Sequence, residues 1–348
     1  MRDFMKHVVD SNVTVRQSME LLNSAKRILF VVQNQKLVGS LSDGDVRRWI
    51  LKGGSLDEPV SVVMHKRPRT VKAGEEERAK DIIREEEMLA VPVLSENGEI
   101  QEIVFWNERD FKKRQHGALT IPVVMMAGGK GERLMPFTSI VPKPLIPIGE
   151  KPISELIIDG LREAGCREFY LVLNYKKNMI KAYYNDLIKD YTINFIEEEE
   201  ELGTGGGLYY LKEKLENTFL LTNCDILLDV DYEDVFRFHK KQNNLITLIT
   251  SLKRYTVPYG TVSLDNDGQI NKMQEKPSVD YLVNTGVYLL EPEVLQRLKN
   301  KRFVHMPDVI GEAIADRERV GTYPISEDAL MDMGQFENME LMKRKLGV

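Results

Sequence analysis

The sequence predicts a chain of two parts, the larger of which is an α/β fold with a mostly parallel sheet. From residue 121 onward, short apolar strands alternate with amphipathic helices, a pattern typical of a parallel sheet with helices on both faces. Before residue 115, one shorter order of strands and helices occurs twice, which indicates a repeated module. The length of 348 residues agrees with two or three domains.

The two N-terminal segments share the order β-α-β-β-α, so they predict a pair of small α+β modules. In the first segment we expect a helix followed by two strands, at residues 15–25, 28–32 and 36–41. The equivalent elements of the second segment are expected at residues 79–86, 89–94 and 100–105. A final helix is expected to begin at Ser42 in the first segment and at Asn107 in the second.

The larger part is expected to build its sheet from apolar runs at residues 122–126, 168–173, 193–196, 219–222 and 245–250. Amphipathic helices are expected between them at residues 153–164 and 179–187. Ligands of such sheets bind at the carboxyl ends of the strands. We therefore expect the functional residues directly after the strands.

The composition describes an ordinary soluble protein, with 42% hydrophobic and 29% charged residues. A net charge of −6 argues against a general nucleic-acid binder. The only two cysteines, Cys166 and Cys224, give neither a disulfide framework nor a zinc pattern. With no signal peptide and no apolar run of membrane-spanning length, we expect no membrane association and a cytoplasmic location.

A glycine-rich turn follows the first apolar strand of the larger part, from Gly128 to Gly131. Glycine lets backbone N–H groups approach an anion closely, because no Cβ stands in the way. Arg133 adds a planar fork for phosphate oxygens, and Lys143 adds a point charge. The spacing is neither the Walker loop nor the dinucleotide fingerprint. It predicts a site for a nucleoside triphosphate.

Two runs in this region, GGKGERLMPFT at residues 128–138 and PKPL at 142–145, resemble the signature of sugar-1-phosphate nucleotidyltransferases. The resemblance implies a Rossmann-like, GT-A-like catalytic domain over residues 121–348, with catalytic roles for Arg133 and Lys143. A second run, EEELGTGGG at residues 199–207, matches the family's element beside the base and ribose. The nucleotide-binding residues that the resemblance implies are Ala127, Gly128, Gly129, Gly131, Glu199, Gly203 and Thr204.

Two carboxylates match the metal positions of this family. Asp225 ends an apolar strand, where a hard oxygen ligand suits Mg²⁺. Asp332 lies in the run Met331-Asp332-Met333-Gly334, which resembles the second metal segment but lacks the family's preceding Trp. The resemblance therefore implies a Mg²⁺ cofactor held by Asp225 and Asp332.

The sugar phosphate is implied by further motifs, P-Y-G at 258–260, E-K-P at 275–277 and N-x-G-x-Y at 284–288. By resemblance, Lys276 binds the phosphate and acts in catalysis, Glu275 binds a sugar hydroxyl, and Gly260 and Asn284 line the sugar site. The five histidines fall outside every matched motif, so we expect them to be structural or exposed. Phosphoryl-type transfer needs positioning and charge neutralisation more than a nucleophilic side chain.

The N-terminal segments resemble a tandem pair of cystathionine-β-synthase (CBS) modules, at residues 1–56 and 57–115, with a linker at 116–120. Ser42 and Asp45 fit that family's ribose-binding pattern at a helix start. They also fit a simple helix cap, and both interpretations stay open. In the second segment Asn107 replaces the hydroxyl residue, whereas Asp110 is kept. A regulatory nucleotide and dimerisation are alternative roles of the pair.

Taken with the CBS pair, the motifs look most like guanylyltransferases of the mannose-1-phosphate type, which make GDP-sugars such as GDP-mannose or GDP-glucosamine for surface glycans. The expected partners are an NTP, with GTP favoured, and a sugar 1-phosphate, in a homo-oligomer. Uridylyl-, thymidylyl- and cytidylyltransferases of the same fold, a choline-phosphate cytidylyltransferase among them, are alternatives. A non-catalytic nucleotide sensor is another, although it would not need two metal carboxylates and a second phosphate lysine.

Overall fold

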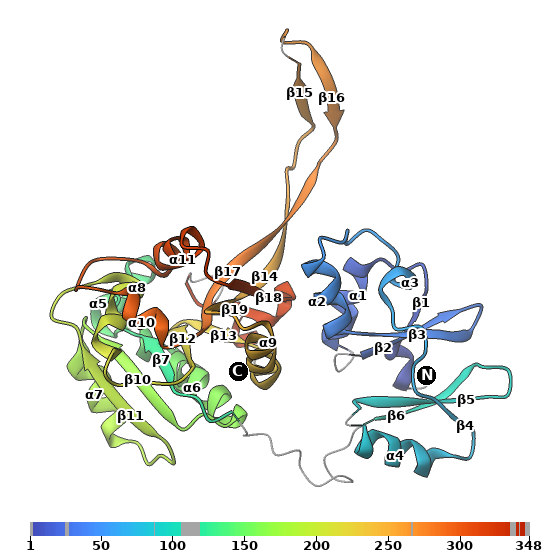
Figure 1. Ribbon diagram of the computed structural model, residues 1–348, viewed down its shortest axis with the longest axis horizontal. Coiled ribbons are helices and arrows are strands. Elements are labelled where there is room, and N and C mark those ends of the chain that lie inside the picture. The colour runs from blue at the N-terminus through green and yellow to red at the C-terminus, as the bar shows by residue number, and fades with distance from the viewer. Residues whose placement is uncertain are drawn as a thin grey trace. The chain divides into compact units, whose positions relative to one another are not determined.

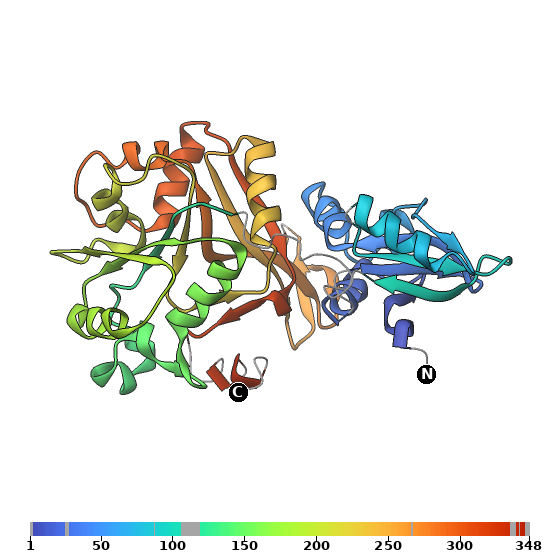
Figure 2. The same cartoon turned by 90° about the horizontal axis from the view of Figure 1, so that it is seen from below.

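A computed structural model shows two compact units, residues 1–115 and 116–348, drawn in Figures 1 and 2. The structure describes residues 3–24, 28–86, 88–105, 119–265, 267–334, 339–340 and 342–344. The expected helix at Asn107 to Asp110 and the linker at 116–120 lie wholly or mainly outside the described residues. In the part of the chain that is described, no helix is long and apolar enough to span a membrane.

Unit 1 contains two runs of elements in a similar order. Its first half runs through η1 (Asp3–His7), β1 (Val8–Asp10), α1 (Val15–Ser24), β2 (Ile28–Gln33), β3 (Lys36–Ser42), α2 (Asp43–Leu51) and α3 (Val60–Val63). The second half runs through β4 (Val71–Lys72), α4 (Glu76–Glu85), β5 (Ala90–Leu94) and β6 (Ile100–Phe105). Each half has a three-stranded sheet in which the first two strands are parallel and the last two antiparallel.

The two halves of unit 1 share one hydrophobic cluster, in which Ile28 and Phe30 pack with Ala90 and Ile103. A hydrogen bond also joins the two halves directly, from the Leu37 N–H to the Gly98 carbonyl at 3.0 Å. The two repeats therefore pack into one compact unit and do not form two separate modules.

Unit 2 is built on a seven-stranded sheet of order β11-β10-β7-β12-β17-β14-β18. Its strands are β7 (Val123–Met126), β10 (Glu168–Leu173), β11 (Thr192–Glu197), β12 (Phe219–Asn223), β14 (Ile246–Thr256), β17 (Ser278–Leu290) and β18 (Val320–Ile325). Only β17 pairs antiparallel with its neighbours in this sheet. The predicted fold class, a mostly parallel α/β sheet, is confirmed.

Helices cover both faces of this sheet (Figure 2). One face packs against α6 (Ile153–Ala164), α7 (Lys177–Asp186) and α9 (Tyr232–Gln242). The other packs against η4 (Gly207–Leu211), α10 (Glu293–Arg297) and α11 (Met306–Ala315). Alternate residues of β7 point to opposite faces, so Val123 lies in the first cluster and Val124 in the second. Each fully buried aliphatic side chain of this kind contributes about 1.5–3 kcal/mol.

Three parallel strands end at the same edge of the sheet. Met126 of β7 pairs with Val172 of β10 on one side and with Asn223 of β12 on the other. The chain leaves these strands into the turn at Gly128, into Asn174 and into Asp225, respectively. This edge is therefore where the predicted functional residues meet.

The outer halves of β14 and β17 leave the sheet as a two-stranded ribbon, which continues through β15 (Thr261–Leu264) and β16 (Ile270–Gln274). In Figure 1 this ribbon extends away from the sheet of unit 2. We call residues 252–283 the arm.

Candidate active site

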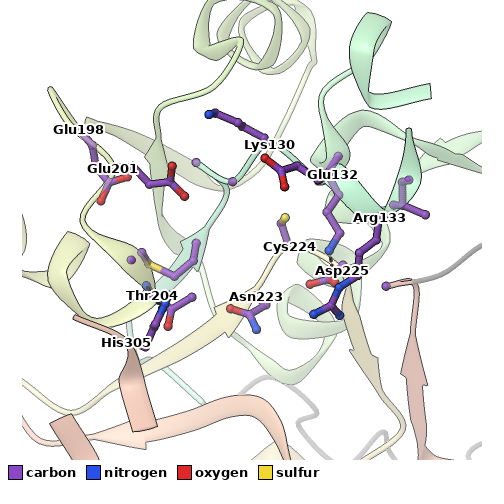
Figure 3. Close-up of a pocket in the computed structure, with 18 residues that line it drawn as sticks. Lys130, Glu132, Arg133, Glu198, Glu201, Thr204, Asn223, Cys224, Asp225 and His305 are labelled. Carbon is purple, nitrogen blue, oxygen red and sulfur yellow. Dashed lines mark hydrogen bonds and ion pairs between the residues drawn. The ribbon is translucent and has the colours of Figure 1, made fainter. Parts of the chain in front are cut away.

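A pocket of about 490 Å³ opens at the carboxyl edge of the sheet. The glycine turn, Arg133, Lys143, part of the run from Glu198 to Thr204 and the end of β12 contribute to its lining. In Figure 3, Arg133 and Asp225 lie at one end, whereas Glu198, Glu201, Thr204 and His305 lie at the other. The pocket thus has a cationic end and an end lined by the Glu198–Thr204 run.

The glycine turn forms one wall because its backbone leaves no room for side chains. A Cβ on Gly128 would lie 2.9 Å from Glu198 Oε2. Gly131 is left-handed, with φ +67°, and a Cβ there would lie 2.9 Å from Thr138 Cγ2. The Thr138 hydroxyl donates to the Gly131 carbonyl at 2.9 Å and fixes the turn. Ala127 is buried beneath the turn and does not line the pocket.

Lys143 forms an ion pair with Asp225 inside the pocket. Both side chains are largely buried, at 19% and 12% exposure. Burial disfavours the charged lysine, but the neighbouring Asp225 carboxylate outweighs it, so the pKa of Lys143 is raised. Burial also raises the pKa of the adjacent Cys224 thiol to about 12, with Asp225 adding to the effect. Lys143 is therefore a fixed cation at the end of the pocket, and Cys224 is held as a neutral thiol.

The two predicted metal carboxylates are brought together by a short antiparallel pair, β13 (Ile226–Leu228) with β19 (Leu330–Asp332). Ile226, next to Asp225, pairs directly with Asp332. The Gly334 N–H donates to Asp332 Oδ1 at 2.6 Å. Across the described residues, no cluster of three or more His, Cys, Asp or Glu side chains forms a metal cage. Two carboxylates suit Mg²⁺, which is usually bound by one or two carboxylates together with substrate phosphates.

The run at 203–206 is positioned by the segment before α11. The Gly205 and Gly206 N–H groups both donate to the Val304 carbonyl, at 2.9 and 3.0 Å. The Thr204 hydroxyl accepts from the Met306 N–H at 3.1 Å. Gly203 is left-handed, with φ +76°, and a Cβ there would lie 2.7 Å from the Val304 carbonyl oxygen. These contacts hold Gly203 and Thr204 in the pocket wall.

Sequence reasoning missed Glu198, which is 5% exposed and lines the pocket. Its Oε1 has no hydrogen-bond partner. Burial, reinforced by Glu201 and partly offset by a hydrogen bond from the Leu202 backbone, raises the pKa of Glu198 to about 7. Glu199, the residue that the motif indicated, is instead exposed and pairs with Lys301 at 3.2 Å. No pattern within the run of five glutamates separates the two positions.

His305 was also missed, because histidines were expected outside the site. It lines the pocket beside Thr204 and caps α11, its N–H donating to Asp308 at 3.0 Å. His239 follows the expectation, since it is fully buried and bonded to Thr247 and Glu291.

The predicted sugar-phosphate residues do not line this pocket. Gly260, Glu275 and Lys276 lie on the arm. Asn284 lies on β17 nearer the sheet, where its amide donates to the Tyr288 hydroxyl at 2.8 Å. Two residues farther on, Gly286 packs against Asn223 in the pocket wall. The pocket thus brings together Gly128, Gly129, Gly131, Gly203 and Thr204 of the predicted nucleotide set, but not Ala127, Glu199 or the sugar-phosphate set.

In unit 1, Ser42 and Asp45 form a reciprocal cap at the start of α2. The Ser42 N–H donates to Asp45 Oδ2 at 2.9 Å, and the Asp45 N–H donates to the Ser42 hydroxyl at 3.3 Å. Arg48 pairs with the other carboxylate oxygen at 2.5 Å. A ribose would have to compete with these bonds, and the role of both residues in nucleotide binding stays a prediction.

Comparison with known proteins agrees with this fold and pocket. Residues 122–346 match the nucleotidyl transferase family, and residues 1–52 match the CBS domain family. The chain belongs to the nucleotidyl transferase family and carries an N-terminal CBS domain.

Several relatives are named as sugar-1-phosphate nucleotidyltransferases. The chain is 31% identical over 195 residues to a UTP–glucose-1-phosphate uridylyltransferase of Synechocystis, covering 49% of each chain. It is 34% identical over 184 residues to mannose-1-phosphate guanyltransferase beta-A of Xenopus laevis, covering 51% of each. The chain thus spans about half the length of these relatives. The crystal structure of HddC from Yersinia pseudotuberculosis shares the fold, with a TM-score of 0.52 at 23% identity over 65% of this chain and 100% of that one.

Proposed function

We propose that this protein transfers a nucleotidyl group from an NTP to a sugar 1-phosphate and releases pyrophosphate. The observation that carries the proposal is the pocket in which the glycine turn, Arg133 and the buried Lys143–Asp225 pair converge. These are groups for triphosphate binding and in-line transfer, which need positioning and charge neutralisation. The names of the relatives agree with this reaction.

The reaction follows from the positions of these groups. The backbone of the glycine turn cradles the triphosphate, and an oxygen of the sugar 1-phosphate attacks the α-phosphorus. Pyrophosphate leaves toward Arg133 and Lys143, whose positive charges stabilise the developing negative charge. Asp225 and Asp332 would hold Mg²⁺, which as a bound cation supplies Lewis-acid stabilisation of the phosphate oxygens. The product is a nucleotide sugar.

For the base we favour guanine, and Glu198 supports that choice. The Glu198 side chain lies at the pocket end opposite Arg133 and Asp225, and its buried Oε1 has no hydrogen-bond partner. An ionised carboxylate only accepts hydrogen bonds. Guanine presents two adjacent donors, N1–H and N2–H₂, whereas uracil and thymine present one N–H between two carbonyls that would repel a carboxylate. A GTP substrate and a GDP-sugar product follow from this pairing, and the resemblance of the sequence motifs favours a sugar of the mannose or glucosamine type.

Pyrophosphate release measured with four NTPs crossed against a panel of sugar 1-phosphates tests the proposal. We expect release with one NTP and one class of sugar, and loss of turnover in Asp225→Asn with its circular dichroism spectrum unchanged. Near wild-type turnover of Asp225→Asn at saturating Mg²⁺ would contradict the assignment of this carboxylate.

The choice of base is tested by Glu198→Gln, because a glutamine amide both donates and accepts. It can therefore pair with the N–H and carbonyl of uracil or thymine. We expect the ratio of kcat/KM for GTP to that for UTP to fall at least about tenfold. Glu199→Gln, next in the chain but exposed and outside the pocket lining, is the matched control. An unchanged ratio in Glu198→Gln would remove this residue from base selection.

A further inference from the structure

The residues matched to the sugar phosphate form a group on the arm. Glu275 lies against Gly260, where a Cβ would approach Glu275 Oε2 to 2.9 Å. Lys276 follows directly and is exposed, in a left-handed conformation with φ +44°. The group is therefore assembled and open to solvent, but it is held on the arm and not at the pocket.

The arm keeps this group far from the pocket of its own chain. Gly286 packs against Asn223 in the pocket wall, and β17 begins eight positions earlier, at Ser278. At about 3.3 Å per residue, that stretch of strand spans about 26 Å, several times the length of a lysine side chain. The ladder from Thr250–Asn284 to Thr256–Ser278 runs without a bulge. Folding the arm back onto its own pocket would break these paired hydrogen bonds.

The arm also exposes far more apolar surface than a free ribbon in water favours. Tyr259, Met273 and Ile270 are 74%, 70% and 64% exposed. Other apolar side chains of the arm that are at least 40% exposed are Tyr255, Val257, Val262, Leu264, Val279, Tyr281 and Leu282. Apolar surface gathered in this way marks an interaction site. At residues 252–283, the arm is about as long as one side of a standard protein interface, roughly 20–30 residues.

A complementary apolar surface lies beside the pocket. Met135, Phe137 and Ile140 are 52%, 58% and 72% exposed, and we call them the rim patch. They directly follow residues 132–134, which line the cationic end of the pocket. Every copy of the chain therefore carries an apolar arm with a phosphate-binding group and, elsewhere in unit 2, an apolar rim beside a pocket that lacks that group.

We propose that the arm of one protomer completes the pocket of a second copy of this chain. In a symmetric dimer, each arm lies on the partner's rim patch and delivers Gly260, Glu275 and Lys276 to the partner's pocket. Such a dimer is a closed twofold assembly, because each protomer uses its arm and its rim patch once and leaves neither surface free for a third copy. The inference rests on the proposed function, since it assigns the sugar-phosphate half of that site to the neighbouring protomer.

Mixed dimers of full-length chains test the exchange. Two chains with different affinity tags are co-expressed, the doubly tagged species is purified, and pyrophosphate release is measured. The first pair combines Asp225→Asn with Lys276→Ala. If arms are exchanged, one of its two sites has both Asp225 and Lys276, so we expect about half of wild-type activity, at a sugar 1-phosphate concentration at which each variant alone gives only background release.

The matched control combines the double variant Asp225→Asn/Lys276→Ala with a wild-type chain. Exchange leaves no intact site in that dimer, so we expect background activity. The reverse pattern, background in the first pair and half activity in the control, overturns the exchange because it places the arm on its own pocket. Full activity of Lys276→Ala alone also overturns it. A wild-type chain that releases no pyrophosphate with any substrate pair instead removes the proposed function itself.

The interface is tested separately by charge on the arm. We expect the wild-type chain to sediment as a dimer, and Ile270→Lys/Met273→Lys to sediment as a monomer with at least tenfold lower activity. Ile188→Lys, at a fully exposed apolar residue outside the arm, is the control and should leave both properties unchanged. A wild-type monomer with full activity, or an arm variant that stays dimeric and active, would overturn the proposal.

Discussion

Replacing Glu198 by glutamine should make unit 2 more stable at alkaline pH and change little in acid. The pKa of this buried carboxyl is raised from its usual 4.5 to about 7. The folded state therefore keeps a proton that the unfolded chain has already released. Stability falls as pH rises through this interval, because the unfolded state binds fewer protons. The cost is absent below about pH 4.5 and complete above about pH 7.

The magnitude follows from the two pKa values. One pKa unit corresponds to about 1.4 kcal/mol, so burial of this carboxyl costs about 3 kcal/mol above pH 7. Between pH 5 and pH 8, Glu198→Gln should gain about 2.5 kcal/mol in free energy of unfolding relative to the wild type. Glu199→Gln should show no such change, because that side chain is 80% exposed.

Urea unfolding followed by two probes gives the measurement. Both tryptophans, Trp49 and Trp106, lie in residues 1–115, so tryptophan fluorescence follows unit 1. Far-UV circular dichroism follows both units, and the transition that fluorescence does not report belongs to unit 2. A difference between Glu198→Gln and wild type that is the same at pH 5 and pH 8 would refute the raised pKa.

Ionisation of Glu198 should also make the affinity for the nucleotide depend on pH. If guanine donates to the ionised carboxylate, the affinity for GDP should rise about tenfold from pH 6 to pH 8 in the wild type, beyond the rise in Glu198→Gln. In Glu198→Gln only the nucleotide phosphates titrate at this site, so the pH profile of this variant is the baseline. Parallel pH profiles in the two proteins would show that Glu198 does not contact the base.

Three further outcomes are expected. Lys143→Ala should raise KM for the NTP more than KM for the sugar 1-phosphate, and Lys276→Ala should do the reverse. Equal effects of each variant on both KM values in steady-state kinetics would contradict the assignment of one lysine to each substrate's phosphates. Gly286→Ala should destabilise unit 2 by about 2 kcal/mol in the urea assay, because φ is +82° and the new Cβ would lie 2.4 Å from Asn223 Nδ2. Gly311→Ala is the control: its Cβ would meet open space, so the substitution should stabilise α11 slightly. Asp45→Ala should lose the hydrogen bond from the Ser42 N–H to the Asp45 carboxylate at the start of α2, worth about 1 kcal/mol. Calorimetry with adenine and guanine nucleotides then decides its second role, since wild-type binding that the variant retains would exclude ribose recognition by this carboxylate.

Much of the fold was predictable because local signals and tertiary packing agree. The helix expected at residues 153–164 forms as α6, Ile153–Ala164, and ends where Gly165 adopts φ +118°. The strand expected at 122–126 forms as β7, Val123–Met126, and its continuous apolar run fits a strand buried on both faces. The glycine turn, Lys143 and Asp225 meet in one pocket because strand ends share one edge of the sheet.

Glu198 could not be predicted, because five successive glutamates from 197 to 201 look alike in sequence. Packing alone separates them. Glu197 reaches the surface, where it pairs with Lys177 at 2.6 Å and with Lys181. Glu198, one residue later, turns under the glycine turn, where its Oε1 finds no hydrogen-bond partner.

The arm was unpredictable for a different reason. Residues 245–250 have the apolar pattern of a buried strand, but the continuation to Thr256 and the return from Ser278 pair with each other and keep apolar side chains such as Tyr255, Val279 and Tyr281 exposed. The motifs at 258–260 and 275–277 indicate a ligand chemistry, but they carry no information on the path of the backbone that presents it. The positions of Gly260, Glu275 and Lys276 are set by the pairing of β14 with β17, which carries them away from the sheet.

The ion pair in the pocket decides which substitutions are informative about catalysis. Lys143 and Asp225 are both largely buried and each neutralises the other. Removing one partner of a buried pair leaves the other charge uncompensated, at a cost of about 3–5 kcal/mol. Asp225→Ala would therefore lose activity through misfolding as readily as through lost chemistry. Asp225→Asn also removes the charge that compensates the lysine, but it keeps the shape and still accepts a hydrogen bond from the lysine. Its loss of turnover therefore reports on the carboxylate charge only where unfolding measurements show that the variant remains folded under the assay conditions.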